Sequence, residues 1–197
     1  FIGAHTIVDL IENGFNVISV DNLSRASDTS IEGIEKITIR LPSFVLGTPA
    51  AGSDRRYPKS LEAAQHSLYY CVVVALLNGA CNEAQFTADN LHSPIIEQLL
   101  AKVELSEDPS LTQGWPIAGG GVDILLRSGK LLTKTITHPP GHPRNPLSEK
   151  QLLEKFNAYV VPVLGADRAA KLYQQLKTIE NCDNLMQLSP YLATLEL

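Results

Sequence analysis

The sequence contains few cysteines, and their spacing argues against two classes of protein. Only three occur among 197 residues, at Cys71, Cys81 and Cys182, and no two form a Cys-x-x-Cys pair. An odd number of cysteines, one of them inside an apolar run, is not the pattern of a zinc site or of a disulfide-stapled secreted domain. The sequence therefore favours a reducing compartment, either the cytoplasm or the mitochondrial matrix of a eukaryote.

Long hydrophobic runs and an excess of positive charge are also missing. The longest apolar run, over 68–77, is about half of the roughly 20 residues that a membrane-spanning helix needs. Lys and Arg number 16 against 21 Asp and Glu, a formal charge of −5, whereas binding to a phosphate backbone needs clustered positive charge. We expect neither a membrane nor a nucleic acid as a partner.

What remains is an ordinary soluble composition, with 44% apolar residues. A chain of this length can bury a sizeable core, as one domain or as two small ones. The sequence opens with Phe1 rather than with Met, and it shows no signal-peptide pattern. We expect a fragment, or a chain whose N-terminus has been removed.

The start of the sequence has the pattern of a truncated dinucleotide-binding unit. Apolar residues at helical spacing predict a helix over 4–13, and the apolar residues of 16–20 predict a buried strand. Asp21 ends this strand eighteen residues after Gly3, which is the spacing at which an acidic residue binds a ribose in such units. The first strand and the two preceding glycines of that unit are absent, so we expect only a remnant.

The opening letters FIGAHTIVDLIENGFNVISVDNLSRAS resemble the start of a nucleotide-sugar epimerase of the short-chain dehydrogenase superfamily. The resemblance covers residues 1–36. It implies that Gly3, Asp21 and Asn22 match positions that help to hold NAD in that family. We expect a Rossmann-like remnant of one helix and one strand, and no bound cofactor.

The next strong pattern predicts one long helix over 61–78. Ser60 can cap its start, Gly79 can end it, and its second half is apolar on every side, which is typical of a buried helix. Three polar residues fall at i, i+4 and i+8 on one face of this helix: Glu62, His66 and Tyr70. Such a stripe is either a satisfied structural network or the wall of a polar cleft, where a phenol and an imidazole can move protons.

The remaining patterns predict a small α+β domain followed by helices. Strands are expected over 37–40, 103–105, 122–127 and 131–137, the last two joined as a hairpin, and a helix over 94–102. Further along, Ser148 and Gln151 form a capping box at the start of a helix. We expect Pro162 to end that helix and Asp167 to cap the next one.

Two other groupings look like functional motifs but have simpler explanations. His138 and His142 are four residues apart, yet the prolines and glycine between them prevent the helix that would aim both at one metal ion. Ser148, Tyr173 and Lys177 fit the catalytic pattern of the short-chain dehydrogenases, although chance alone provides roughly 0.3 such Tyr-x-x-x-Lys pairs. We expect no metal site, and we interpret Ser148 as a helix cap.

Three stretches in order resemble the C-terminal part of the MmgE/PrpD family: YPKSLEAAQHSLYYCVVVALLNG, LLAKVELSEDPSL and HPPGHPRNPLSEKQLLEKF. The resemblance covers residues 37–197. It implies a small α+β domain over 37–145 and C-terminal helices of a helical domain over 146–197. The family includes 2-methylcitrate dehydratase, cis-aconitate decarboxylase and iminodisuccinate epimerase, which act on small polycarboxylates without a metal or a nucleotide.

The resemblance also implies where the site lies. The tyrosine of the family's His-Ser-x-x-Tyr element lines the active cleft, and it falls on Tyr70, with His66 as a supporting residue. The cations Lys59, Arg55 and Arg144 are candidates to bind the carboxylates of a substrate. A phenol is a weak acid, so we expect Tyr70 to act as an acid or a hydrogen-bond donor rather than as a base.

We therefore expect the C-terminal part of a cofactor-independent lyase or isomerase, incomplete as a catalyst on its own because most substrate-binding residues of the family precede this region. One alternative is a non-catalytic association module that forms a homodimer or a scaffold. Another is a vestigial fragment of an NAD-dependent nucleotide-sugar epimerase.

Overall fold

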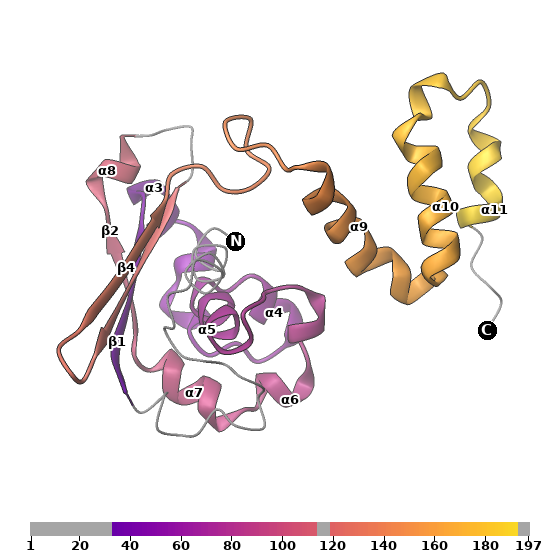
Figure 1. Cartoon of the computed structure of the whole chain (residues 1–197). Helices are drawn as coiled ribbons and strands as arrows, with labels where there is room; N and C mark the ends of the chain where they lie inside the picture. Colours follow the sequence, from indigo (N-terminus) through magenta and orange to yellow (C-terminus); the bar gives the residue numbers. More distant parts are fainter. Residues whose placement is uncertain (1–32, 114–118, 193–197) are drawn as a thin grey trace. The chain divides into compact units, whose positions relative to one another are not determined.

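The computed structural model describes residues 33–113 and 119–192. The chain divides into two compact units, residues 1–140 and 141–197 (Figure 1). The helix over 4–13, the strand over 16–20 and the NAD-associated positions Gly3, Asp21 and Asn22 lie outside the described residues. The expected domain boundaries after residues 36 and 145 stay predictions, although the first strand of the sheet crosses residue 36.

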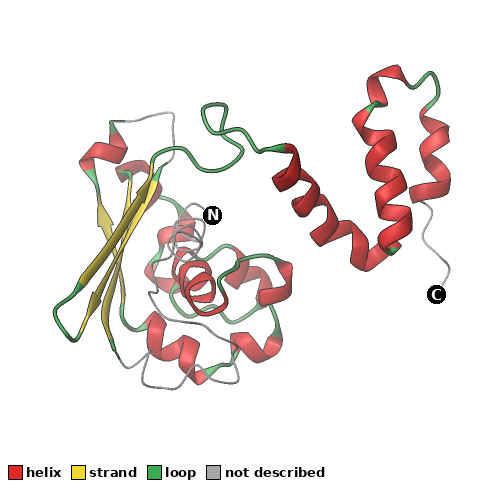
Figure 2. Ribbon diagram, in the orientation of Figure 1, coloured by secondary structure: helices red, strands yellow, loops and turns green. Residues whose placement is uncertain are grey.

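The first unit is built on a four-stranded mixed sheet with the strand order β2-β1-β3-β4. Its strands are β1 (Ile34–Leu41), β2 (Val103–Glu107), β3 (Gly120–Leu126) and β4 (Leu131–Ile136). The β1 strand pairs in parallel with β2 and antiparallel with β3, and β3 forms the expected hairpin with β4. Figure 2 shows helices covering one face of this sheet. The small α+β fold is confirmed.

Alternation along β1 explains which face of the sheet is covered. Ile37, Ile39 and Leu41 are buried, and the pattern reaches back to buried Ile34 because a bulge between Ile34 and Lys36 shifts the register by one residue. The buried side chains of β1 therefore all point towards the helices.

On the opposite face of β1, Arg40 organises a polar network. Its guanidinium group binds Asp123 at 2.9 Å, Asp108 at 2.5 Å and the Thr135 hydroxyl at 2.6 Å. Gly121 lies across from Arg40 in the register, and a Cβ atom there would come within 2.7 Å of the guanidinium carbon. A Cβ atom at this position would therefore push the guanidinium group from its present place in the network.

The helical layer of the first unit consists of short helices around one buried helix. The α-helices are α3 (Ser43–Leu46), α4 (Leu61–Gln65), α5 (Leu68–Asn78), α6 (Ala88–Leu91), α7 (Pro94–Leu100) and α8 (Pro109–Thr112), and single turns occur at Pro49–Ala51, Ser53–Arg55 and Glu83–Gln85. The prediction of one helix over 61–78 is wrong, because the chain breaks between α4 and α5. Ser67 adopts an extended backbone there and caps α5.

Two hydrogen bonds of Ser67 give the physical reason for this break. Its hydroxyl accepts from the Tyr70 backbone N–H at 3.1 Å and donates to the Arg55 carbonyl at 2.6 Å. A serine at a helix N-cap can make both of these hydrogen bonds at once. Such a serine is more stable at the start of a new helix than inside a continuous one. Glu62 and His66 are consequently exposed while Tyr70 is fully buried, so the three do not form one buried stripe.

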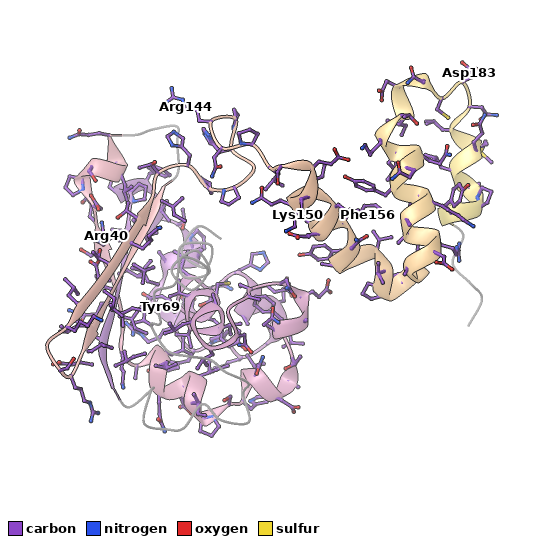
Figure 3. All side chains as sticks on the ribbon, in the orientation of Figure 1. Arg40, Tyr69, Arg144, Lys150, Phe156 and Asp183 are labelled. Atoms are coloured by element: carbon purple, nitrogen blue, oxygen red, sulfur yellow. The ribbon has the colours of Figure 1, made fainter. Side chains whose placement is uncertain are left out.

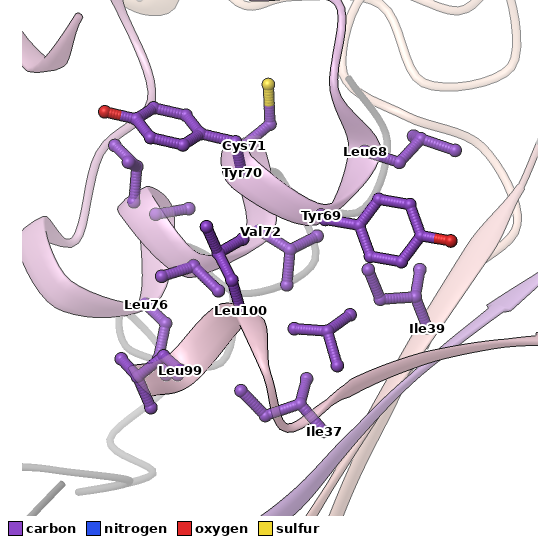
Figure 4. Packing of buried hydrophobic residues seen from close by; sticks show 14 of the residues in the cluster. Ile37, Ile39, Leu68, Tyr69, Tyr70, Cys71, Val72, Leu76, Leu99 and Leu100 are labelled. Atoms are coloured by element: carbon purple, nitrogen blue, oxygen red, sulfur yellow. The ribbon is translucent and has the colours of Figure 1, made fainter. Parts of the chain in front are cut away.

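The core of the first unit lies between α5 and the sheet. Nine of the eleven α5 residues are buried, and Gly79 ends the helix in the left-handed conformation at φ 64°. Figure 4 shows Tyr69 and Tyr70 leaving α5 on opposite sides, with Tyr69 directed towards Ile39 of β1. Tyr69 therefore belongs to the interior against the sheet, and Tyr70 faces the other way.

The second unit is helical. Its elements are α9 (Glu149–Leu164), α10 (Ala166–Lys177), single turns at Ile179–Asn181 and Leu185–Leu188, and α11 (Ser189–Leu192). The capping box of Ser148 and Gln151 is confirmed. Phe156 packs on Tyr173 with ring centroids 5.2 Å apart, and Lys177 forms an ion pair with Glu149, so that α9 and α10 are held together along their length.

Two predicted helix boundaries in this unit are wrong. Pro162 lies inside α9, which continues to Leu164 and ends at Gly165. A proline in the last turn removes only one late hydrogen bond, so it does not stop the helix there. Gly165 rather than Asp167 is the N-cap of α10. Asp167 lies in the first turn, where its negative charge interacts favourably with the helix dipole.

Candidate functional site

Tyr70 is the most unusual polar residue of the first unit. It is completely buried in α5, its ring packs on Phe86 with centroids 5.9 Å apart, and its hydroxyl has no hydrogen-bond partner among the described residues. Burial, followed by the nearby Cys71 and Cys81 thiols, raises the pKa of Tyr70 to about 12. At neutral pH the phenol is therefore protonated, and it can donate a hydrogen bond to an oxygen that enters the site.

A pocket with a volume of about 370 Å³ adjoins Tyr70. Its polar residues are Tyr57, Lys59, Tyr70, His92, Ser93 and Glu97, and apolar residues of α6 and α7 complete it. Lys59, His92 and Glu97 are exposed whereas Tyr70 is buried. These three side chains therefore belong to the solvent side of the pocket and the phenol to its interior. We call this the Tyr70 pocket.

Arg56 supports the segment that carries Tyr57 and Lys59. Its guanidinium group donates to the carbonyls of Leu100 at 2.8 Å and Val103 at 2.5 Å. The same group lies 4.7 Å from the centre of the Tyr69 ring, a cation–π contact. The segment that contains Lys59 is thus tied to the end of α7 and to β2. Sequence reasoning gave no role to Arg56 and missed this one.

His66 lies in a different pocket from Tyr70. The second pocket has a volume of about 590 Å³, and its lining includes Arg55, Ser60, Glu62 and His66. The Nδ1 atom of His66 is 2.9 Å from the Glu62 carbonyl oxygen, which satisfies one ring nitrogen locally. The structure therefore brings Lys59 together with Tyr70 at one pocket, and Arg55 together with His66 at another.

Four polar residues of the Tyr70 pocket were missed by sequence reasoning: Tyr57, His92, Ser93 and Glu97. The Ser93-Pro94 pair was interpreted correctly as a helix start, but the Ser93 side chain makes no capping hydrogen bond. A cap residue whose hydroxyl is not used for capping is available for another contact. This signal appears only once the hydrogen bonds of the helix start are known.

Arg144 belongs to the second unit, in the loop that precedes α9 (Figure 3). Its side chain is exposed, and its backbone N–H donates to the Nδ1 atom of His142 at 3.0 Å. Its role in binding a substrate carboxylate stays a prediction, as do the catalytic roles of Tyr70 and His66.

The grouping that resembles a dehydrogenase triad has structural explanations. Ser148 caps α9, Tyr173 is buried against Phe156, and Lys177 is ion-paired with Glu149, which raises the pKa of the lysine. No three or more His, Cys, Asp or Glu side chains within 33–113 and 119–192 are grouped to hold a metal ion. In the same part of the chain, no helix combines the length and apolar character needed to cross a bilayer.

Comparison with known proteins places these observations in a family. A model of the MmgE/PrpD C-terminal domain matches residues 2–180. Human cis-aconitate decarboxylase is 28% identical over 159 residues, which cover 81% of this chain and 32% of that enzyme. The mouse cis-aconitate decarboxylase is 28% identical over 158 residues, covering 79% and 31%. The chain thus spans about a third of the length of these curated relatives.

A second similarity is confined to a short stretch. The UDP-glucose 4-epimerase of Erwinia amylovora is 43% identical over 47 residues, which are 24% of this chain and 14% of that enzyme. The family model, by contrast, accounts for most of the sequence. The chain belongs to the MmgE/PrpD C-terminal domain family.

Proposed function

We propose that this chain is part of a lyase or isomerase that acts on a small polycarboxylate, and that the Tyr70 pocket receives one end of the substrate. The observation that carries the proposal is the buried Tyr70 hydroxyl, which lines a pocket and lacks a partner in the described structure. A buried donor without an acceptor is costly, and an acceptor that a substrate brings would remove this cost. The name of the cis-aconitate decarboxylases supports the substrate class.

In this proposal Tyr70 and Lys59 have different tasks. Removal of a C–H proton beside a carboxylate places negative charge on the carboxylate oxygens. A phenol that is protonated at neutral pH can donate a hydrogen bond to such an oxygen, and this bond strengthens as the charge develops. The exposed Lys59 ammonium group forms an ion pair with another carboxylate of the substrate.

The base that removes the proton is a different residue. A phenol with a pKa of about 12 is too seldom ionised at neutral pH to act as an efficient base. Because dehydration, decarboxylation and epimerisation share this early proton removal, the same supporting tyrosine serves any of the three. Association of two copies of the chain stays a prediction, which concentration-dependent sedimentation will check.

Binding to the isolated chain tests the location of the site. We expect cis-aconitate, titrated by calorimetry, to bind the wild-type chain and to lose about tenfold in affinity with Lys59→Ala, because one ion pair is lost. Arg55→Ala is the matched control, since Arg55 lines the other pocket. If Arg55→Ala weakens binding and Lys59→Ala does not, the site is the His66 pocket and the proposal is wrong.

Turnover in a chimera tests the role of Tyr70. In this chimera, the chain replaces the matching region of human cis-aconitate decarboxylase. Turnover is measured as the consumption of cis-aconitate. We expect Tyr70→Phe to lower kcat at least about tenfold, because the donor to the charged oxygen is lost. Tyr69→Phe, which removes a hydroxyl that donates to the Ala51 carbonyl away from the Tyr70 pocket, is the control and should keep its turnover. Equal turnover for Tyr70→Phe and the parent chimera would contradict the role of Tyr70.

A further inference from the structure

Tyr57, Pro58 and Lys59 form a short segment that lines one side of the Tyr70 pocket. We call these three residues the Lys59 segment. Tyr57 and Lys59 are exposed, and neither makes a hydrogen bond to another residue within 33–113 or 119–192. Because no hydrogen bond of its own fixes the segment in this part of the chain, its position depends on the residues at its two ends.

Both ends of the Lys59 segment are attached to the helical layer. After the segment, the Ser60 hydroxyl accepts from the Ala63 backbone N–H at 3.2 Å and caps α4. Before it, the Arg55 carbonyl accepts from the Ser67 hydroxyl at 2.6 Å, which ties the backbone to the start of α5. The residue between this anchor and the segment is Arg56, so its side chain controls where the segment begins.

The Arg56 side chain joins the Lys59 segment to another wall of the same pocket. Its Nη1 atom donates both to the Leu100 carbonyl at 2.8 Å and to the Val103 carbonyl at 2.5 Å. Leu100 lines the pocket and ends α7, the helix that also contributes Ile96 and Glu97 to the lining. A guanidinium group held by two carbonyls and by the face of the Tyr69 ring has little freedom to move.

We propose that Arg56 is a positioning residue of the Tyr70 pocket, which holds Lys59 where its ammonium group meets a carboxylate of the ligand. The proposal rests on the proposed function for the identity of that ligand. Arg56 acts through Lys59 and not on the ligand, because protein carbonyls engage its guanidinium group. A lysine on a segment that is already fixed loses less conformational freedom on binding, so Arg56 raises the affinity without a contact of its own.

Limited digestion of the folded chain tests whether Arg56 holds the segment, and it needs no ligand. Trypsin cleaves after lysine where the backbone can move into the active site of the protease. We expect Arg56→Met to raise the initial rate of cleavage after Lys59 at least about fivefold relative to cleavage after Lys130, in the β3–β4 turn. Arg55→Met is the matched control and should leave this ratio unchanged, because Arg55 pairs with Asp54 instead. An unchanged ratio in Arg56→Met overturns the proposal.

A double-mutant cycle tests whether Arg56 acts through Lys59. The affinity for cis-aconitate is measured by calorimetry for the wild type, for Arg56→Met, for Lys59→Ala and for the double variant. We expect losses of about fivefold for Arg56→Met and about tenfold for both Lys59→Ala and the double variant, because Arg56 then has no lysine to position. A merely structural role predicts a loss of about fiftyfold in the double variant, since independent losses multiply. That result overturns the proposal.

Arg56→Lys separates the position of Lys59 from the charge of Arg56. Lysine keeps a positive charge near the Tyr69 ring, but its side chain is shorter and lacks the planar fork, so we expect a loss of about threefold in affinity. Wild-type affinity in Arg56→Lys overturns the proposal, because charge alone then explains the loss in Arg56→Met. Urea unfolding shows which variants fold, and Arg56→Lys replaces Arg56→Met in both tests if the latter does not.

Failure of the proposed function gives a different result. In that case the wild-type chain does not bind cis-aconitate, or Lys59→Ala binds it as tightly as the wild type. The digestion then decides alone whether Arg56 holds the Lys59 segment, because cleavage after Lys59 does not depend on the ligand.

Discussion

The buried helix α5 and the longer helix α9 obtain their stability in different ways. Nine of the eleven residues of α5 are buried, whereas none of the sixteen residues of α9 is. The first helix is held by apolar packing against the sheet. The second depends on its capping box, its ion pair with Lys177 and the contact between Phe156 and Tyr173. Helical pattern alone does not distinguish the two, because packing rather than propensity supplies most helix stability.

Matched leucine truncations are expected to show the largest difference in stability cost between these two helices. Leu76→Ala in α5 removes a side chain that is 1% exposed and should cost about 2–5 kcal/mol, because it leaves a cavity. Leu152→Ala in α9 removes a side chain that is 50% exposed and should change stability by less than about 0.5 kcal/mol. Urea unfolding of both variants measures this. Equal costs would show that α9 packs as tightly as α5.

A smaller difference is expected for the serine caps of the same two helices. Ser67→Ala should cost about 1–3 kcal/mol, because it removes the cap and leaves the Arg55 carbonyl without its donor. Ser148→Ala removes an exposed cap and should cost about 1 kcal/mol. Thermal unfolding compares them, with Ser67→Thr as the conservative control. A Ser67→Ala cost no larger than that of Ser148→Ala would remove Ser67 as the cause of the helix break.

The smallest effect at neutral pH is expected for Tyr70→Phe, which removes a buried hydroxyl that lacks a partner. We expect stability to stay equal or to rise by up to about 1 kcal/mol. At high pH the two proteins should diverge. The phenol ionises near pH 10 in the unfolded chain but near 12 in the folded one, so the unfolded state releases the proton first.

Wild-type stability therefore falls as the pH rises from about 10 towards 12. The Tyr70→Phe variant should not show this loss of stability, because it has no phenol to ionise at this position. Stability measured against pH for both chains checks the sign, and the ultraviolet absorbance of the phenolate identifies the group. Identical pH profiles would mean that Tyr70 ionises as an ordinary exposed tyrosine.

Much of the fold could be predicted because local patterns carry it. Alternation over 37–40, the glycine turn between β3 and β4 and the Ser148 capping box each involve residues that are close in sequence. The pocket could be predicted only in part. Tyr70 and Lys59 were expected at the site, but His66 was placed with Tyr70 on the assumption that 61–78 is one continuous helix.

The sequence by itself determined the α+β class, the helix that buries its residues and the family, because apolar periodicity and ordered motifs are properties of the linear chain. Only the tertiary structure decided where that helix begins, since the Ser67 cap depends on a carbonyl twelve residues away at Arg55. It also decided that the Tyr70 hydroxyl has no partner in the described structure. Both features depend on contacts between segments that are apart in the sequence, which no local pattern encodes, because hydrogen bonds act through space between segments that folding brings together.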